Sequence, residues 1–338
     1  MLEIKENMMT TMRSRLKSWP RLLSRFVRQL KSPLQIARHS FHRDTHFTNL
    51  SDYSVRSYQS VRSSRDPYLV KVVQGRSKRQ RYAGERSNQR FGEDSWFVSS
   101  TPLAEVLGVA DGVGGWRDMG VDAGRFAKEL MSCCSGRAQH SDFDGRNPRD
   151  LLIAGYQELS DRKHPVVGSS TACLVTMHRR ECTLYTANLG DSGFMVVRNG
   201  QVLHRSQEQT HDFNTPYQLA VAPENQRDYV YSDRPEMAVS TRHSLQPGDL
   251  VLLATDGLFD NLPESMLLKI LNGLKERDER ELLVGASQVV DKARELSLNA
   301  NYQSPFALKA REHNVPYPGG GKPDDITLIL ASVEVPNV

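Results

Sequence analysis

Apolar residues fall into short segments from about residue 91 to the end of the chain, whereas the residues before that point are mostly polar. Short segments rich in Val, Leu and Ile are typical of β-strands, and longer segments with apolar residues at helical spacing are typical of helices. The predicted strands are 95–98, 106–110, 170–177, 182–188, 194–197, 202–204, 249–254 and 326–333. The predicted helices are 122–134, 148–159, 264–274 and 279–298.

The order of these elements indicates an α+β fold built on antiparallel strands. Asn199-Gly200 separates two of the predicted strands, and this dipeptide is a strong signal for a β-hairpin. The sheets need helices to cover their outer faces, and the predicted helices come in pairs between the strands. No break in composition divides this part of the chain, so we expect one large domain.

The N-terminal segment, residues 1–45, has a different character. Residues 7–43 contain no Asp or Glu but nine Lys or Arg, and Leu16, Trp19, Leu23 and Phe26 recur at roughly helical spacing. A basic amphipathic segment of this kind is typical of a mitochondrial transit peptide. Glu3, Glu6 and Pro20 do not fit that pattern, so a basic tail without fixed structure is the alternative, with a cytoplasmic protein as its consequence.

Residues 46–84 are polar and are predicted to be a linker, in which 68–73 is the only strand-like run. The net charge of +4 comes from the N-terminal segment, so the rest of the chain does not have the basic surface of a nucleic-acid-binding domain. The four cysteines form no CxxC pair, which argues against a structural zinc site. No apolar run is long enough to predict a transmembrane helix.

Carboxylates recur at the ends of the apolar strands. For any one of them a turn is the simpler explanation, since Asp and Gly are favoured in turns. Taken together they indicate more, because strand ends that converge would bring several carboxylates into one place, where they repel one another. A divalent cation such as Mg²⁺ or Mn²⁺ removes that repulsion and prefers oxygen ligands. The positions are Glu93-Asp94, Asp111-Gly112, Asp191, Asp256 with Asp260, and Asp324-Asp325.

The order of these motifs resembles that of the type 2C metal-dependent protein phosphatases. The similarity covers residues 85–335 and also includes Gly168-Ser169-Ser170-Thr171-Ala172. Two further segments, 112–116 and 321–327, are similar to the branch of that family that has mitochondrial members. Six motifs in the same order make a chance match improbable.

The resemblance implies a four-layer α-β-β-α sandwich with two antiparallel sheets, in which residues 85–335 form the phosphatase domain. It implies two Mg²⁺ or Mn²⁺ ions, attack on phosphorus by a water between them, and phosphoserine and phosphothreonine in proteins as substrates. A monomer is expected. By this resemblance Asp111 would bridge the two ions, and the carbonyl oxygen of Gly112 would bind one of them. Asp256 and Asp324 would bind the other ion, while Glu93 and Asp94 would act in catalysis through ion-bound waters. Asp191 and Asp260 would bind a weaker third ion.

Two positions depart from the family pattern. Gln89 stands where many members have a phosphate-binding Arg, and Val113 stands where many have a His that is a candidate general acid. A phosphatase-like binding module without catalysis is therefore the alternative function. A different metal hydrolase would need histidine ligands, and His211 and His243 are predicted to lie in loops.

Overall fold

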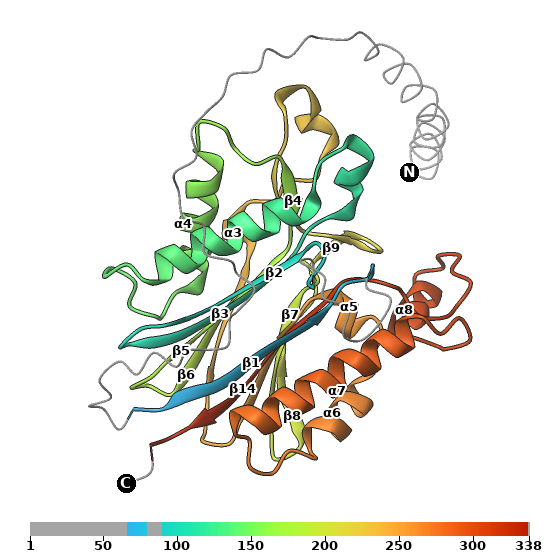
Figure 1. Ribbon diagram of the computed structural model, residues 1–338. Coiled ribbons are helices and arrows are strands. Elements are labelled where there is room, and N and C mark those ends of the chain that lie inside the picture. The colour runs from blue at the N-terminus through green and yellow to red at the C-terminus, as the bar shows by residue number, and fades with distance from the viewer. Residues whose placement is uncertain (1–65, 80–89, 337–338) are drawn as a thin grey trace, which may run out of the picture. The chain divides into compact units, whose positions relative to one another are not determined.

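Two antiparallel five-stranded sheets form the centre of the computed structural model, which describes residues 66–79 and 90–336 (Figure 1). The first sheet has the order β1 (Tyr68–Arg76), β14 (Ile326–Glu334), β13 (Leu250–Ala254), β7 (Gly193–Arg198) and β8 (Gln201–Arg205). The second has the order β12 (Val239–Ser244), β6 (Thr183–Leu189), β5 (Ala172–His178), β3 (Ala104–Asp111) and β2 (Asp94–Ser100).

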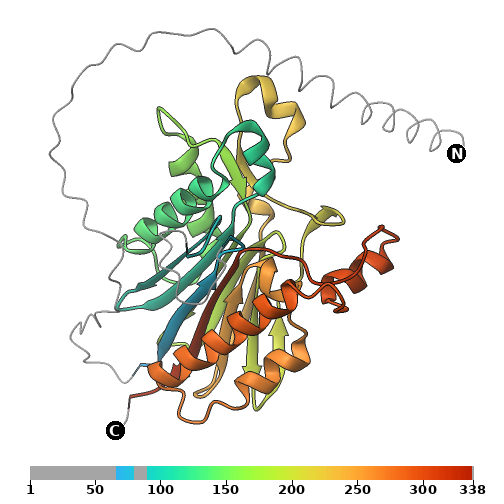
Figure 2. The same ribbon diagram turned by 45° about the vertical axis from the view of Figure 1, so that its right-hand side comes forward.

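Helices cover the outer face of each sheet. The helices α3 (Ala123–Ala138) and α4 (Pro148–Ser160) lie on the second sheet, and α6 (Glu264–Leu271) and α7 (Glu279–Ser297) lie on the first. Figure 2 shows α7 running along β1 and β14. Side-chain caps begin two of these helices: Asp122 accepts a hydrogen bond from the Gly124 amide, and Asp278 accepts one from the Glu281 amide. The predicted four-layer α-β-β-α sandwich is confirmed.

The apolar core has three layers, one beneath each pair of helices and one between the sheets. Strand β14 shows how the sequence produces them, because successive side chains of a strand point to opposite faces. Ile326, Leu328 and Leu330 pack with α6 and α7, whereas Ile329 and Ala331 pack against the other sheet. A strand buried on both faces reads as a continuous apolar run, which is why it could be predicted.

Shorter elements complete the fold around one end of the sandwich. The sequence pattern predicted none of them as separate elements, although the predicted strand 170–177 includes the last residue of β4, Ser170. They are β4 (Gly168–Ser170), β9 (Thr210–Asp212), β10 (Thr215–Pro216), β11 (Leu219–Val221), the one-turn helix α5 (Asp256–Phe259), α8 (Pro305–Glu312), and three 3-10 helices at Gly114–Met119 (η2), Glu224–Tyr229 and Pro235–Met237.

The predicted boundary of the domain at residue 85 is wrong. Strand β1 lies inside the predicted linker, yet it pairs with β14 along its full length, from Tyr68 opposite Glu334 to Arg76 opposite Ile326. Its side chains are mostly half-buried, so the apolar pattern is weaker than that of the central strands. Residues 1–45, with the predicted transit peptide, and Gln89 lie outside the described residues. Among the described helices, none is both long and apolar enough to cross a membrane.

Candidate active site

The acidic motifs converge at one end of the sandwich. Asp111 ends β3, Asp94 begins β2 directly opposite it, and Asp256 follows β13. Asp324 lies two residues before β14, while Asp191 lies in the turn between β6 and β7. The antiparallel topology explains this convergence, because the end of one strand lies beside the start of its neighbour. The predicted juxtaposition of carboxylates from separate strands therefore exists in the fold.

The carboxylates are close enough to affect one another's ionisation. Burial raises the pKa of Asp111 well above its usual range, and Asp256, Asp94, Asp324 and Asp191 raise it further. Burial and the neighbouring Asp256 likewise raise the pKa of Asp191. Each carboxylate thus makes ionisation of the next less favourable, which is the condition that a bound cation relieves.

Asp94 is fixed by a hydroxyl from the opposite sheet. The Thr255 hydroxyl donates to Asp94 Oδ2 at 2.8 Å, and this hydroxyl oxygen of Thr255 accepts a hydrogen bond from the Thr327 amide at 3.0 Å. The other oxygen of the carboxylate, Oδ1, is buried without a hydrogen-bond partner among the described residues. Burial and the nearby Asp325 raise the pKa of Asp94 well above its usual range, although the hydrogen bond from Thr255 opposes the shift.

The Gly168–Ala172 motif supports Asp111. The Thr171 amide donates to the Asp111 carbonyl at 3.0 Å, and the Asp111 amide donates to the Thr171 hydroxyl at 3.1 Å. That hydroxyl also forms a hydrogen bond of 2.8 Å with the hydroxyl of Ser192, which follows Asp191. The motif therefore fixes the backbone of two carboxylate residues and leaves their side chains free to face the site.

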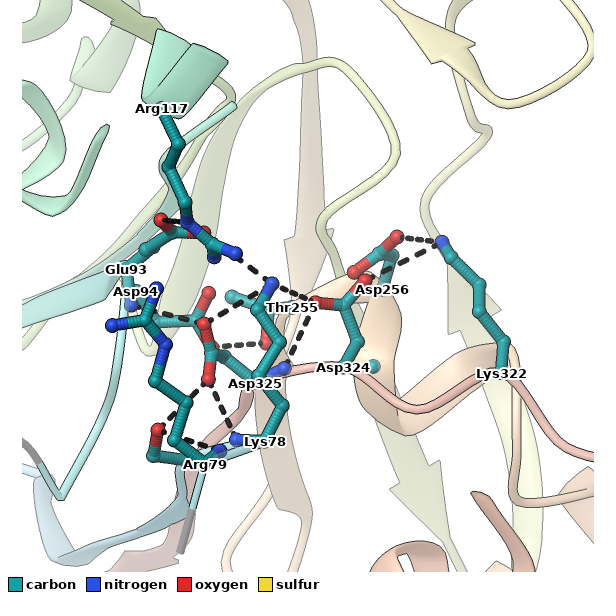
Figure 3. Close-up of polar contacts among 12 residues, drawn as sticks. Lys78, Arg79, Glu93, Asp94, Arg117, Thr255, Asp256, Lys322, Asp324 and Asp325 are labelled. Carbon is teal, nitrogen blue, oxygen red and sulfur yellow. Dashed lines mark hydrogen bonds and ion pairs between the residues drawn. The ribbon is translucent and has the colours of Figure 1, made fainter. Parts of the chain in front are cut away.

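Two cationic side chains lie on the Glu93 side of the carboxylates, and neither was predicted (Figure 3). Lys78 Nζ lies 2.8 Å from Asp324 Oδ1 and 3.3 Å from Glu93 Oε2. Arg117, from η2, forms a bidentate ion pair with Glu93. Burial would lower the pKa of Lys78, but Asp324, Asp325 and Glu93 outweigh it, so the pKa is raised and the ammonium stays charged.

Asp325, unlike Asp324, accepts hydrogen bonds that connect neighbouring segments of the chain. Its carboxylate is buried and accepts hydrogen bonds from the Lys78 amide at 2.7 Å, the Ser77 hydroxyl at 3.1 Å and the Glu93 amide at 3.0 Å. It therefore joins the end of β1 to the loop that carries Glu93. This role explains why β1 belongs to the functional domain and not to a linker.

The donor set fits hard divalent cations. Within residues 66–79 and 90–336, no three carboxylate, His or Cys side chains already surround a common point. However, Asp94, Asp191 and Asp256 each have a buried Oδ1 without a hydrogen-bond partner in this described part. Burying such an oxygen lowers the stability of the fold unless a cation or a water molecule binds it. Sites made only of oxygen ligands suit Mg²⁺ and Mn²⁺. The amide of Gly112 donates to the Glu93 carbonyl, which places Gly112 beside the carboxylates.

Asp260 lies next to Asp256 on the far side of the cluster from Lys78. These two carboxylates and Asp191 line a pocket of about 60 Å³, whose other walls include Phe213 and Phe306. All the predicted site residues thus lie at the same end of the sandwich. Their roles as ligands remain predictions.

The position of the expected general acid carries no proton donor. Val113 caps the start of η2, and its amide donates to the Ser169 carbonyl. His211 lies in β9 and His243 in β12, so the prediction that they lie in loops is wrong. His211 bonds to Asp233, and His243 stacks on His204. Neither contact involves the carboxylate cluster.

Comparisons with known proteins agree with this geometry. Residues 105–334 match the family described as Stage II sporulation protein E (SpoIIE). The chain is 78% identical over 321 residues to the protein phosphatase PTC7 homolog fig of Drosophila yakuba, covering 95% of this chain and 98% of that protein. It is 76% identical over 322 residues to the Drosophila melanogaster protein of the same name, with the same coverage.

Among solved structures, the photosystem II phosphatase PBCP is 27% identical with a TM-score of 0.67, covering 79% of this chain and 99% of that one. A Streptococcus agalactiae structure described as a serine/threonine phosphatase has a TM-score of 0.52 at 14% identity, covering 79% of this chain and 100% of that one. The second likeness shows the shared fold alone.

Proposed function

The chain belongs to the PTC7-homolog family of protein phosphatases, and we propose that it hydrolyses phosphoserine and phosphothreonine in proteins with the help of two Mg²⁺ or Mn²⁺ ions. The observation that carries this proposal is the convergence of Asp94, Asp111, Asp256 and Asp324 at one end of the sandwich, where Asp94 and Asp256 each have a buried Oδ1 without a hydrogen-bond partner among the residues that the structure describes. The high identity to relatives named as protein phosphatases supports the same substrate class.

We infer that Asp111, Asp256 and Asp324 hold the ions, with the carbonyl of Gly112 as a further ligand. Ions bound there would neutralise phosphoryl oxygens and lower the pKa of water to a value useful at neutral pH. The buried environment of Asp111 contributes directly, since electrostatic interactions are stronger away from bulk water. Asp191 and Asp260 lie beside this set, across the small pocket.

Glu93 and Asp94 have different surroundings, which suggest different tasks. Asp94 is 6% exposed, and Thr255 holds it in one orientation, so we expect it to position water inside the site. Glu93 is also buried, but its carboxylate is bound by the cationic side chains of Arg117 and Lys78. The carboxylate of Glu93 thereby holds two cations at the edge of the site.

Arg117 is our candidate for the missing phosphate-binding arginine. Its guanidinium is about one-third exposed, so it can reach a ligand that enters from solvent. A guanidinium matches the oxygens of a phosphate bidentately, as it matches Glu93 here. Val113 has no proton to donate, so we infer that the leaving serine or threonine oxygen takes its proton from water in the site.

The decisive experiment separates catalysis from binding alone. Purified full-length protein is incubated with a phosphoserine peptide and Mn²⁺, beside an Asp111→Asn variant and a sample with EDTA. We expect phosphate release that requires Mn²⁺ and is lost in the variant. Mn²⁺ binding by calorimetry without phosphate release from a wide panel of phosphopeptides would instead establish the binding-module alternative.

We propose a mitochondrial location on the basis of residues 7–43, which combine basic charge with helically spaced apolar residues. Full-length protein with a C-terminal tag is compared by imaging with a form that lacks residues 1–45. Mitochondrial signal for the first and diffuse signal for the second is the expected result. Diffuse signal for both would contradict the proposal and favour the basic-tail alternative.

A further inference from the structure

Lys322 places an ammonium group inside the carboxylate cluster, on the opposite side from Lys78 (Figure 3). Its Nζ lies 2.5 Å from Asp256 Oδ2 and 2.7 Å from Asp260 Oδ2. It is also 3.7 Å from Asp324 Oδ2. One side chain therefore binds three of the acidic residues at once. This contact belongs to the chain itself and needs no added ion.

The backbone holds Lys322 in this position. Its amide donates to Asn261 Oδ1 at 2.8 Å, and its carbonyl accepts from Asn261 Nδ2 at 2.8 Å. Asn261 is fully buried and also donates to the Gly257 carbonyl at 2.9 Å, within the segment that carries Asp256 and Asp260. A two-bond link of this kind fixes both the distance and the direction of the lysine relative to its carboxylates.

The side chain has little freedom to leave. Lys322 is 16% exposed, and its Nζ lies 4.9 Å from the centre of the Phe306 ring, where a cation is favoured. The Phe306 amide in turn donates to the Asp260 carbonyl.

The carboxylates around Lys322 have more oxygen atoms than one ammonium group can bind. Asp191 and Asp256 both have a buried Oδ1 without a hydrogen-bond partner in the described chain, beside the pocket of about 60 Å³ that Asp260 also lines. A cavity of about 10–15 Å³ by the same measure holds one water molecule, so this pocket has room for an ion with a water ligand. Removing the ammonium would leave a larger, more negative site.

We propose that Lys322 is a resident cation of the active site, which neutralises Asp256 and Asp260 and so keeps an additional divalent ion out of the Asp191–Asp260 pocket. The inference rests on the proposed function only in that both concern the same carboxylates. The ammonium group of Lys322 would have two effects. It would stabilise the folded protein before ions bind, and it would limit the number of ions that bind afterwards.

The test is the number of Mn²⁺ ions bound per full-length chain, measured by calorimetry and by metal analysis after gel filtration. We expect Lys322→Met to bind one ion more than the wild type and Lys322→Arg to bind the same number as the wild type. The double variant Lys322→Met with Asp260→Asn should lose the additional ion. Equal stoichiometry in wild type and Lys322→Met would overturn the proposal.

A control outside the pocket is Lys292→Met. Lys292 Nζ pairs with Glu295 at 2.8 Å within α7, and its side chain is 37% exposed. It should leave the number of bound ions unchanged, and a gain of an ion there would contradict the special role of Lys322. Thermal unfolding in EDTA gives a second readout: Lys322→Met should lower the Tm of the ion-free protein, and Mn²⁺ should restore it.

These measurements separate the two proposals. Wild-type protein that binds no Mn²⁺ would contradict the proposed function, whatever the variants do. Wild-type protein that binds Mn²⁺ and releases phosphate, with the same ion number in Lys322→Met, would leave the proposed function intact and remove only the role given to Lys322.

Discussion

Asp94 and Asp111 lie directly opposite one another in the pairing of β2 with β3. Asp94 is buried and Asp111 is half-buried, so two carboxylates face each other where desolvation raises the pKa of both. Such an arrangement is unfavourable for folding and is retained where function requires it. Asp111 should therefore favour activity but disfavour folding.

Replacing Asp111 by Asn should lower phosphatase activity by about 100-fold or more, since an amide removes a charge that holds ions in the site. In EDTA the same change should stabilise the protein, because an amide removes the repulsion between the carboxylate of Asp111 and its neighbours Asp256 and Asp94. Thermal unfolding and phosphopeptide hydrolysis give the two readouts. Asp118→Asn, at an exposed position of η2, is the control and should change neither.

The pH dependence of that stabilisation has a definite sign. The pKa of Asp111 in the folded, ion-free protein is raised above its ordinary value of 3.8, so the folded state binds this proton more tightly than the unfolded state does. The resulting stability is complete below the ordinary value and is lost as pH rises toward the folded pKa. The gain from Asp111→Asn should therefore grow with pH. A gain that is constant with pH would argue against a raised pKa.

A second prediction concerns the hydroxyl that joins the two sheets. Thr255→Val keeps the shape of the side chain but removes the donor to Asp94 Oδ2 and the acceptor of the Thr327 amide. Leaving buried groups unpaired costs about 1–3 kcal/mol, so denaturant unfolding should show a loss of that size. Activity should fall as well, because Asp94 loses its fixed orientation. Thr255→Ser keeps the hydroxyl and should retain most of both properties; equal losses in the two variants would refute the assignment.

The sequence predicted the central strands because β3, β5, β13 and β14 are buried on both faces and therefore read as unbroken apolar runs. It failed for β12, whose side chains are almost all exposed although its backbone pairs with β6. Backbone pairing leaves no trace in side-chain polarity, so such strands are hard to find from composition alone.

The site shows the same division. The carboxylates could be predicted because each follows or precedes an apolar strand, and several such ends recur. Lys78, Arg117 and Lys322 could not, because a single basic residue in a polar stretch has no pattern that distinguishes it from a solvated surface residue. Their positions depend on contacts such as that between Lys322 and Asn261, which only the folded chain brings together.

Gly112 should tolerate no side chain. A Cβ atom there would lie 2.5 Å from the Ala123 carbonyl oxygen and 2.7 Å from that of Glu93, both in the backbone. Gly112→Ala should therefore shift the loop beside Asp111, destabilise the protein by about 1–3 kcal/mol and reduce Mn²⁺ affinity. Gly115→Ala is the matched control three residues away, because a Cβ there meets no atom within 4 Å. Similar stability for both variants would contradict the close approach.

The cysteines should take no part in catalysis. Burial raises the pKa of all four, Cys133, Cys134, Cys173 and Cys182, so little reactive thiolate exists at neutral pH. Iodoacetamide at pH 7 should leave the activity of the folded protein unchanged, while the unfolded protein is modified at all four sites, as counted by mass spectrometry. Inactivation that parallels modification of one cysteine would point to a thiol in the mechanism.

The last prediction tests Arg117 as the residue that binds the phosphoryl group. Arg117→Ala removes a guanidinium whose hydrogen bonds to a charged partner are worth about 1.5–3 kcal/mol. Inorganic phosphate should then inhibit about 10- to 100-fold more weakly, with a matching rise in KM for a phosphopeptide. The number of Mn²⁺ ions bound should stay the same, which separates phosphate binding from disturbance of the carboxylates.

Two comparisons make that result interpretable. Arg162 pairs with Glu129 at 2.7 Å, and its side chain is 36% exposed against 34% for Arg117, so Arg162→Ala removes an equivalent ion pair away from the site. It should leave the phosphate inhibition constant unchanged. Arg117→Lys keeps the charge without the bidentate geometry and should fall between wild type and Arg117→Ala. If Arg117→Ala lowers kcat and Mn²⁺ affinity but leaves phosphate inhibition intact, then Arg117 only positions Glu93.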